Sequence, residues 1–275
     1  VVTTPCGADG SINPDLLRAI DLCGATEVYR IGGAQAIAAL ALGVESIGKT
    51  PKVFGPGNAY VVAAKRALFG NVAIDLLPGP SELLVIADEN APTAFIAADL
   101  IAQAEHGSGH ERVWLLSTAE STLEATRREV ATQLQGRDRR EAIERALEAN
   151  GYLIHVDSMA TATQLANRLA PEHCEVLAAD DEAIAAQLHT SGAIFLGPYS
   201  PTALGDYVAG PSHVLPTGGA GASFGGLTVD QFQRRTSVVR SDRDALRGMW
   251  PTVEILAGLE GLDGHARSVG IRLDT

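Results

Sequence analysis

The sequence lacks the short motifs that mark several large classes of enzymes. Its three cysteines lie far apart without CxxC spacing, which argues against a thiolate zinc site and a disulfide framework and is typical of a reducing cytosol. The absence of GxSxG and HExxH argues against a serine hydrolase and a zinc hydrolase. Neither GxGxxG nor GxxxxGKS/T occurs, so any nucleotide would have to bind to a less standard loop.

Basic charge and long apolar runs are also scarce. The 275 residues include 21 Lys and Arg against 33 Asp and Glu, a formal net charge of −12, which argues against binding to a nucleic-acid backbone. There is no apolar run of membrane-spanning length, and the opening VVTTPCGADG has no signal-peptide pattern. We therefore predict a cytoplasmic protein without membrane contacts. The first residue is not Met, so we expect the chain to begin inside a larger polypeptide.

What is present is an alternation of strands and helices that predicts an α/β fold with parallel sheets flanked by helices. A length of 275 residues suggests about two domains. In the first part the strand VVTT is followed by a helix at 15–23, a strand at 27–31, a helix at 32–43, a strand at 52–57, a helix at 58–70 and a strand at 72–77.

A second alternating part follows, and its pattern predicts a further parallel sheet. We expect strands at 82–88, 112–118, 152–156, 174–179 and 193–197, with helices at 91–107, within 119–150, at 160–170 and at 181–190. Residues 197–226 are rich in Gly, Pro and Ser, and a loop of this length is usually functional or disordered. Residues 229–239 and 251–260 are predicted to be helical, and residues 266–273 to form a strand or an extended arm.

Polar residues at the end of the 91–107 helix are candidate metal ligands. Gln103 and His106 are three residues apart, on one face of a helix. An imidazole nitrogen with amide and carboxylate oxygens suits Zn²⁺ or Mn²⁺, and Asp206 and His265 are further candidates. From spacing alone, each also fits a structural role, as a helix cap, a turn residue or a solvated loop histidine.

Glu172 and His173 form an exposed-looking pair in a predicted loop after Pro171. Ligands of open α/β sheets bind at connecting loops, and His173 could accept a proton from an alcohol while the carboxylate activates water. Adjacent residues of an extended segment point in opposite directions, so a shared site requires an irregular backbone. The alternative is that Glu172 caps a terminus and His173 lies on the surface.

Gly-rich turns supply the remaining candidate binding residues. The GPSE and GPSH turns place Ser81 and His213 where they could hydrogen-bond a ligand. GGAQA and GPGNAY each open a helix, whose N-terminal amides favour an anion such as pyrophosphate, with Gln35 and Asn58 as additional donors. Such turns are also common without any ligand.

Taken together, these motifs resemble those of the histidinol dehydrogenase family over essentially the whole chain. The matching stretches include KVFGPGNAYVVAAKR, AIDLLPGPSELLVIAD, DLIAQAEHG, APEHCEV, FLGPYSPTALGDYVAGPSHVLPT and GLDGHARSV. The resemblance implies two incomplete Rossmann-like domains and a C-terminal helical or extended segment. We therefore expect an NAD-binding domain at 1–80, a zinc and substrate domain at 81–225, and a dimerisation arm at 226–275.

The resemblance also implies an activity, the oxidation of L-histidinol to L-histidine by two hydride transfers to NAD through a bound aldehyde. Zinc would be held by Gln103, His106, Asp206 and His265, and Glu172 and His173 would be catalytic. The substrate would contact the four zinc ligands, His173 and three further residues. In the homodimer, two of the residues that contact the substrate would reach the partner's site. The further substrate contacts are Ser81, His213 and Glu260, the NAD contacts are Gln35 and Asn58, and the residues shared across the dimer are Glu260 and His265.

The chain departs from the family in lacking its long N-terminal segment, which supplies part of the 81–225 scaffold. For a fragment we expect weak or no turnover and exposed apolar surface. Two alternatives remain open at this point. One is a related zinc and NAD dehydrogenase of another small alcohol, and the other is a non-catalytic, metal-binding or dimerising remnant of the enzyme.

Overall fold

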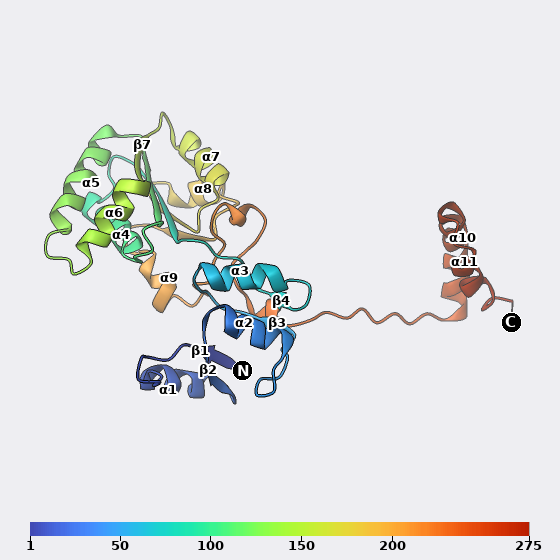
Figure 1. Ribbon diagram of the computed structural model, residues 1–275. Coiled ribbons are helices and arrows are strands. Elements are labelled where there is room, and N and C mark those ends of the chain that lie inside the picture. The colour runs from blue at the N-terminus through green and yellow to red at the C-terminus, as the bar shows by residue number, and fades with distance from the viewer. Residues whose placement is uncertain (275) are drawn as a thin grey trace. The chain divides into compact units, whose positions relative to one another are not determined.

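A computed structural model describes residues 1–274. The chain divides into two compact units, one comprising Val1–Phe232 and the other beginning at Gln233. All strand pairs within the sheets of the first unit are parallel, which confirms the predicted α/β fold class with helices flanking parallel sheets (Figure 1).

The first 80 residues form two small sheets instead of one continuous sheet. Strands β1 and β2 pair with each other, and β3 pairs with β4. Ile37 and Leu40 pack against Val53 and Val61 in the core between these elements. The elements are β1 Val2–Thr4, α1 Pro14–Leu22, β2 Val28–Arg30, α2 Gly33–Leu42, β3 Lys52–Val53, α3 Ala59–Leu68 and β4 Ala73–Ile74.

Helix boundaries in this part follow the signals in the sequence. Asn58 Oδ1 accepts hydrogen bonds from the N–H groups of Tyr60 and Val61 at 3.1 and 3.2 Å, so it caps α3, which begins where the helix at 58–70 was predicted. Gly43 follows α2 with φ of +81°, a conformation that is costly for residues with a Cβ atom and therefore ends the helix.

A five-stranded parallel sheet forms the centre of the next part, in the order β7-β6-β5-β8-β9. Every residue of β5 is buried, because β5 has neighbours on both edges and helices on both faces. The edge strand β7 exposes Tyr152 and Leu153. The strands are β5 Glu82–Ala87, β6 Arg112–Ser117, β7 Gly151–His155, β8 His173–Leu177 and β9 Ala193–Leu196.

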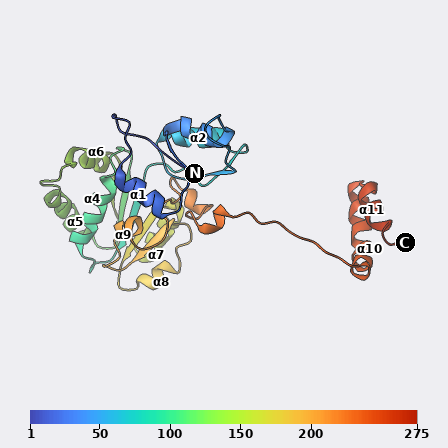
Figure 2. The same ribbon diagram turned by 90° about the horizontal axis from the view of Figure 1, so that it is seen from below.

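Helices cover both faces of this sheet (Figures 1 and 2). One face carries α4 Thr93–Ala104, α5 Glu120–Gln133 and α6 Arg140–Asn150, and the other carries α7 Met159–Leu169 and α8 Asp181–Ala185. Alternate residues of β5 enter different cores: Val85 packs with Leu100 of α4, and Leu84 packs with the α7 side. This alternation fixes which residues of each strand share a face.

The Gly- and Pro-rich stretch after β9 contains little regular structure. It includes the short helix α9 Ala203–Tyr207 and two 3₁₀ turns, Ala220–Ala222 and Val229–Phe232. Its end returns to β3, where the rings of Phe54 and Phe232 stack with centroids 4.0 Å apart. The long loop of the prediction is therefore ordered by contacts with the rest of the first unit.

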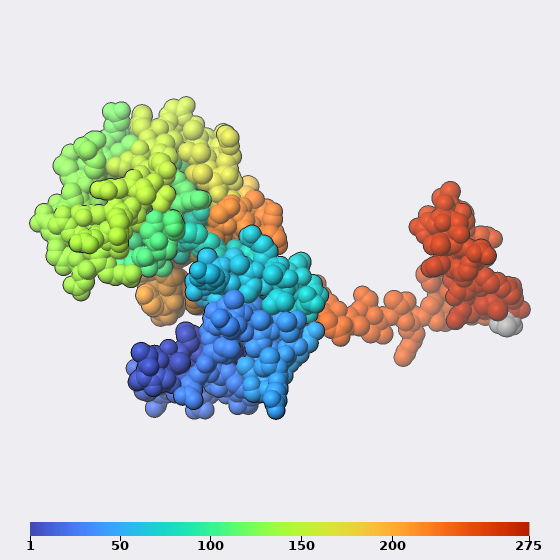
Figure 3. Space-filling model, viewed as in Figure 1, coloured from blue at the N-terminus to red at the C-terminus, as the bar shows by residue number. Residues whose placement is uncertain are grey.

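The second unit differs from the prediction in two places. Residues 233–242 form no helix and are exposed (Figure 3), so the predicted helix at 229–239 is wrong apart from the 3₁₀ turn at its start. Helix α10 spans Arg243–Glu260, with Asp242 as its N-cap. The predicted strand or extended arm at 266–273 is also wrong: α11 spans Asp263–Gly270 and packs on α10, where Gly270 faces Trp250.

In residues 1–274 no helix combines the length and the apolar character that crossing a bilayer requires.

Candidate active site

A cavity of about 200 Å³ lies at the amino ends of β5 and β8. Ligands of open parallel sheets usually bind at the carboxyl ends of the strands, so this position departs from the expectation. Helix α4 follows β5 and returns to the same edge, which brings its last turn towards the cavity. Six of the predicted site residues line it, namely Ser81, His106, Glu172, His173, Asp206 and His213.

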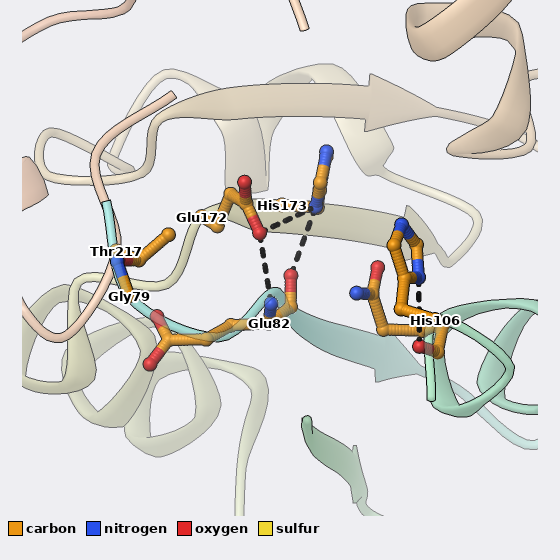
Figure 4. A network of polar contacts seen from close by, with 7 residues as sticks. Gly79, Glu82, His106, Glu172, His173 and Thr217 are labelled. Atoms are coloured by element: carbon orange, nitrogen blue, oxygen red, sulfur yellow. Dashed lines mark hydrogen bonds and ion pairs between the residues drawn. The ribbon is translucent and has the colours of Figure 1, made fainter. Parts of the chain in front are cut away.

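His173 is the first residue of β8 and is buried. Its Nδ1 lies 2.9 Å from the carbonyl oxygen of Glu82 (Figure 4). A carbonyl oxygen only accepts hydrogen bonds, so Nδ1 carries the proton and Nε2 has a free lone pair. Burial lowers the pKa of His173 below its usual value, which keeps the ring neutral near pH 7 and able to accept a proton.

Glu172 lies beside His173 and is also buried, so the interpretation of the pair as exposed is wrong. Its Oε2 accepts a hydrogen bond from the backbone N–H of Glu82 at 2.8 Å and lies 3.5 Å from Nδ1 of His173. Glu172 occupies a bend just before β8, and this bend turns both side chains towards β5. Burial raises the pKa of Glu172 to about 8.

The candidate metal ligands from α4 are placed by the end of that helix. The helix ends at Ala104, earlier than predicted, and His106 lies in the turn that follows. His106 Nδ1 is 3.0 Å from the carbonyl oxygen of Gln103, so Nδ1 is the donor and Nε2 is free to bind a ligand. The Gln103 amide is buried, and its Nε2 has no hydrogen-bond partner.

Asp206 comes from α9, on a different segment of the first unit. Its charge acts on both Glu172 and His173, raising the pKa of each as a minor contribution after burial. His106 opposes protonation of His173. These effects show that Asp206 and His106 lie close to the buried pair.

The donors present fit zinc by type. Gln103, His106 and Asp206 offer one nitrogen and two kinds of oxygen, which zinc accepts. The unpartnered Gln103 atom is the donor Nε2, so the amide would bind the metal through its oxygen. No group of three or more His, Cys, Asp or Glu side chains in residues 1–274 is arranged to hold a metal ion. Among the candidate ligands, the first unit supplies only His106 and Asp206 as His, Cys, Asp or Glu side chains. A further ligand of these types would have to come from outside the first unit.

Five predicted residues do not line the cavity: the buried Gln103 and four others. Glu260 ends α10 and His265 lies in α11, both in the second unit and both exposed. Gln35 and Asn58 have exposed side chains at the starts of α2 and α3. Residues 56 and 57, just before Asn58, do line the cavity. Because Asn58 Oδ1 is engaged in capping α3, only the amide N–H₂ group of Asn58 could donate a hydrogen bond to a ligand bound beside it.

The sequence did not identify Glu82 and Thr217 as parts of the site. The backbone N–H of Glu82 bonds to Glu172, and its C=O bonds to His173. Because almost every residue type has these backbone groups, the sequence cannot reveal this role. The Thr217 hydroxyl accepts a hydrogen bond from the Gly79 N–H, which ties the loop after α9 to the GPSE turn (Figure 4). The available clue was that Glu82 belongs to the GPSE motif, next to the candidate Ser81.

The fold and this site define an α/β protein with a buried imidazole beside a buried carboxyl group at one cavity. The family model described as histidinol dehydrogenase matches residues 1–273. The chain therefore belongs to the histidinol dehydrogenase family of oxidoreductases.

Individual relatives agree with this assignment. The chain is 46% identical to the histidinol dehydrogenases of Heliobacterium mobile and Nitrobacter winogradskyi over 274 residues, 100% of this chain in both cases. The crystal structure of histidinol dehydrogenase from Elizabethkingia anophelis superposes with a TM-score of 0.95 at 38% identity over 99% of this chain. The chain spans 64% and 63% of those two sequences and 63% of the solved chain.

Proposed function

We propose that this chain carries the active site of an enzyme that oxidises L-histidinol to L-histidine through bound L-histidinaldehyde, with zinc and NAD as cofactors. The observation that carries the proposal is the buried His173, whose Nδ1–H is committed to Glu82 so that Nε2 is available in the cavity. Membership of the histidinol dehydrogenase family supports this substrate.

His173 is the base for oxidation of the alcohol. Its neutral ring, favoured by burial and by the lowered pKa, accepts the hydroxyl proton at Nε2 while hydride leaves the carbon. Bound NAD supplies the hydride acceptor in both oxidations. The carbonyl of Glu82 keeps the ring in the tautomer that this step needs.

Glu172 assists the second half of the reaction. A pKa of about 8 lets this carboxyl exchange a proton near neutral pH, as a general acid–base group requires. It helps a water molecule add to the aldehyde, and the resulting hydrate then gives up the second hydride. Because Glu172 and His173 share the same wall of the cavity, one bound aldehyde can meet both groups.

Zinc would be held by Gln103, His106 and Asp206 with His265. Bound zinc would act as a template that orients the amino and imidazole nitrogens of the substrate. Ser81 and His213 line the same cavity and are proposed, with Glu260, to bind the substrate together with the zinc ligands and His173.

NAD would bind over the first part of the chain, within the proposed 1–80 domain. The N–H groups of Gly55, Tyr60 and Val61 are bonded to Asp75 and Asn58. The backbone N–H groups of residues 57–59, before and at the start of α3, would bind an anion such as pyrophosphate, and the Asn58 amide lies at that helix start. Gln35 occupies the first turn of α2. Residues 56 and 57 also line the cavity, which would place the cofactor next to the substrate.

The active assembly is proposed to be a homodimer in which Glu260 and His265 enter the partner's site. These two residues belong to the second unit, outside the cavity lining. The proposed substrate domain at 81–225 would then be completed by the proposed dimerisation arm at 226–275 of another copy.

The test combines metal content with NADH formation from L-histidinol by this chain supplied with zinc and NAD. We expect bound zinc, two NADH for each L-histidine formed and much less NADH from small alcohols without an imidazole. Equal rates with such alcohols would favour a related dehydrogenase. A chain that binds neither zinc nor histidinol would contradict the proposal.

A further inference from the structure

A second pair of acidic side chains is buried behind the site. Asp99 of α4 is 7% exposed and Glu175 of β8 is 1% exposed. Their carboxyl groups lie within hydrogen-bonding reach of each other, and Glu175 Oε2 is buried without another partner. Two acidic groups in an apolar core are costly, and the proposed reaction uses neither of them. Their position relative to the catalytic residues indicates what they do.

Glu175 lies on the same face of β8 as His173. Side chains alternate along a strand, so residues 173, 175 and 177 share one face. Leu177 packs in the core on the α4 side, whereas Cys174 and Val176 pack in the core on the α7 side. The side chains of His173 and Glu175 therefore both lie on the face that α4 covers.

Asp99 likewise lies on the same face of its element, helix α4, as Gln103. The two are four residues apart on α4, hence on one face a single turn apart, and both are buried. The hydrogen bond between Asp99 and Glu175 therefore joins α4 to β8. Its α4 end lies one turn before Gln103, and its β8 end lies two residues after His173. The link spans the two elements that carry the proposed metal ligand and the proposed base.

Burial favours a single proton shared between the two carboxyl groups. Burial raises the pKa of Glu175 to about 9 and that of Asp99 to about 6, so near pH 7 Glu175 is neutral and donates to the Asp99 carboxylate. A hydrogen bond to an ionised acceptor is stronger and more directional than a neutral one. Apolar contacts between α4 and the sheet lack this directionality.

We propose that Asp99 and Glu175 are positioning residues, which fix α4 against β8 and thereby set the placement of Gln103 and His106 relative to His173. The inference deepens the proposed function, on which the roles of those three residues depend. A purely stabilising role would be served as well by two apolar side chains, because buried ionic groups can often be replaced by hydrophobic ones without loss of stability.

Two substitutions of nearly equal size separate positioning from packing. Glu175→Gln keeps a neutral side chain that can donate to Asp99, and Glu175→Met keeps the volume but has no donor. The imidazole nitrogens of His106 and His173 are followed by ¹⁵N NMR in the metal-free protein near pH 7, with His173→Asn to assign the His173 signals. Thermal unfolding shows whether each variant is folded.

We expect Glu175→Gln to give the wild-type imidazole spectrum and near wild-type turnover. In Glu175→Met the His173 and His106 signals should shift or broaden, and kcat should fall about tenfold, because small displacements of reacting groups are costly. The KM for NAD should stay unchanged. Identical imidazole spectra in the two variants, with Glu175→Met folded, would overturn the positioning role.

If Glu175→Met fails to fold, the double variant Asp99→Leu with Glu175→Met takes its place in the comparison, because it leaves no unpaired carboxyl group. The His173 and His106 signals of the double variant should likewise shift or broaden. The NMR comparison requires neither zinc nor histidinol. A wild-type chain without zinc binding or NADH formation would therefore contradict the proposed function, while the imidazole spectra would still decide the positioning role.

Discussion

The Nδ1 atom of His173 lies 2.9 Å from the carbonyl oxygen of Glu82, and this contact leaves the lone pair on the other ring nitrogen, Nε2, which is the proposed base. The N–H of Glu82 donates to Glu172 at 2.8 Å. The backbone of one residue, the first of β5, therefore orients both catalytic candidates. Because β5 is buried at the centre of its sheet, this support is rigid.

Replacing His173 by Asn should abolish the first oxidation. The Asn amide can still donate to the Glu82 carbonyl, but it has no basic nitrogen, and loss of a general base costs about 100-fold or more in rate. NADH formation from L-histidinol measures the effect. Metal content is the control and should stay at the wild-type value, because His173 is not a proposed zinc ligand.

Glu172→Gln should mainly slow oxidation of the aldehyde. The amide oxygen can still accept from the Glu82 N–H, so the structure should be retained, but the side chain no longer exchanges a proton. Rates with L-histidinol and with L-histidinaldehyde, measured separately, distinguish the two steps. Full two-step activity in both this variant and His173→Asn would show that the assigned roles are wrong.

The elements with strong local signals could be predicted from the sequence. Asn58 and Gly43 mark helix ends through capping and a positive φ, and the predicted helices at 58–70 and 32–43 begin and end at these residues. The apolar stretch beginning at Glu82 was correctly predicted to be a buried strand. These features depend on residues close in the chain, which is why the sequence alone reveals them.

Features that depend on distant contacts could not be predicted in the same way. The burial of Glu172 and His173 results from their position against Glu82, about ninety residues away. Residues 266–273 suggested an extended segment, but contact with α10 favours the helix α11. The carboxyl pair of Asp99 and Glu175 likewise appears only when α4 lies on β8.

Stability should fall as pH rises towards 8, partly through Glu172. Its pKa is about 8 in the folded protein against an ordinary value of 4.5. Between these values the folded state holds a proton that the unfolded chain releases, so this group lowers stability by up to about 1.4 kcal/mol per pH unit. The loss is complete once pH exceeds the folded value.

Urea unfolding at pH 6 and pH 7.5 tests this dependence. Glu172→Gln should show a shallower decrease than wild type, and Glu175→Gln should do the same because the pKa of Glu175 is also raised, to about 9. An equal decrease in Glu172→Gln and wild type would mean that Glu172 is ionised in the folded protein at these pH values.

Thr217→Val should loosen the GPSE turn. The Thr217 hydroxyl accepts from the Gly79 N–H, and its loss should cost about 1 kcal/mol of stability. Ser81 is two residues from this hydrogen bond, so we also expect a higher KM for histidinol. Thr217→Ser keeps the hydroxyl and is the matched control, and equal KM values in the two variants would exclude this link.

The buried ion pair of Lys65 and Asp75 should stabilise the turn at the proposed NAD site. Both side chains are almost fully buried, and each also bonds to the backbone of Gly55. Lys65→Met would leave Asp75 as an unpaired buried charge, which costs about 3–5 kcal/mol. A comparable change in the exposed pair Arg140–Glu144 should cost under about 0.5 kcal/mol.

A double-mutant cycle with Lys65→Met and Asp75→Leu measures the coupling in this pair. Chemical unfolding of the double variant should show a smaller loss than the sum of the single losses, because no unpaired charge remains. Additive losses would show that the two side chains act independently. NAD affinity of the double variant then reports whether the Gly55 turn needs the pair.

Complementation between inactive variants tests whether His265 serves the partner's site. His173→Asn and His265→Ala should each be inactive as homodimers. In a mixed dimer one site combines both defects, whereas the other has an intact His173 and receives an intact His265 from its partner. After co-refolding equal amounts, about a quarter of all sites should be active, since half of the dimers are mixed and each has one good site. If His265 instead acted within its own chain, neither site of the mixed dimer would be complete and NADH formation would not return.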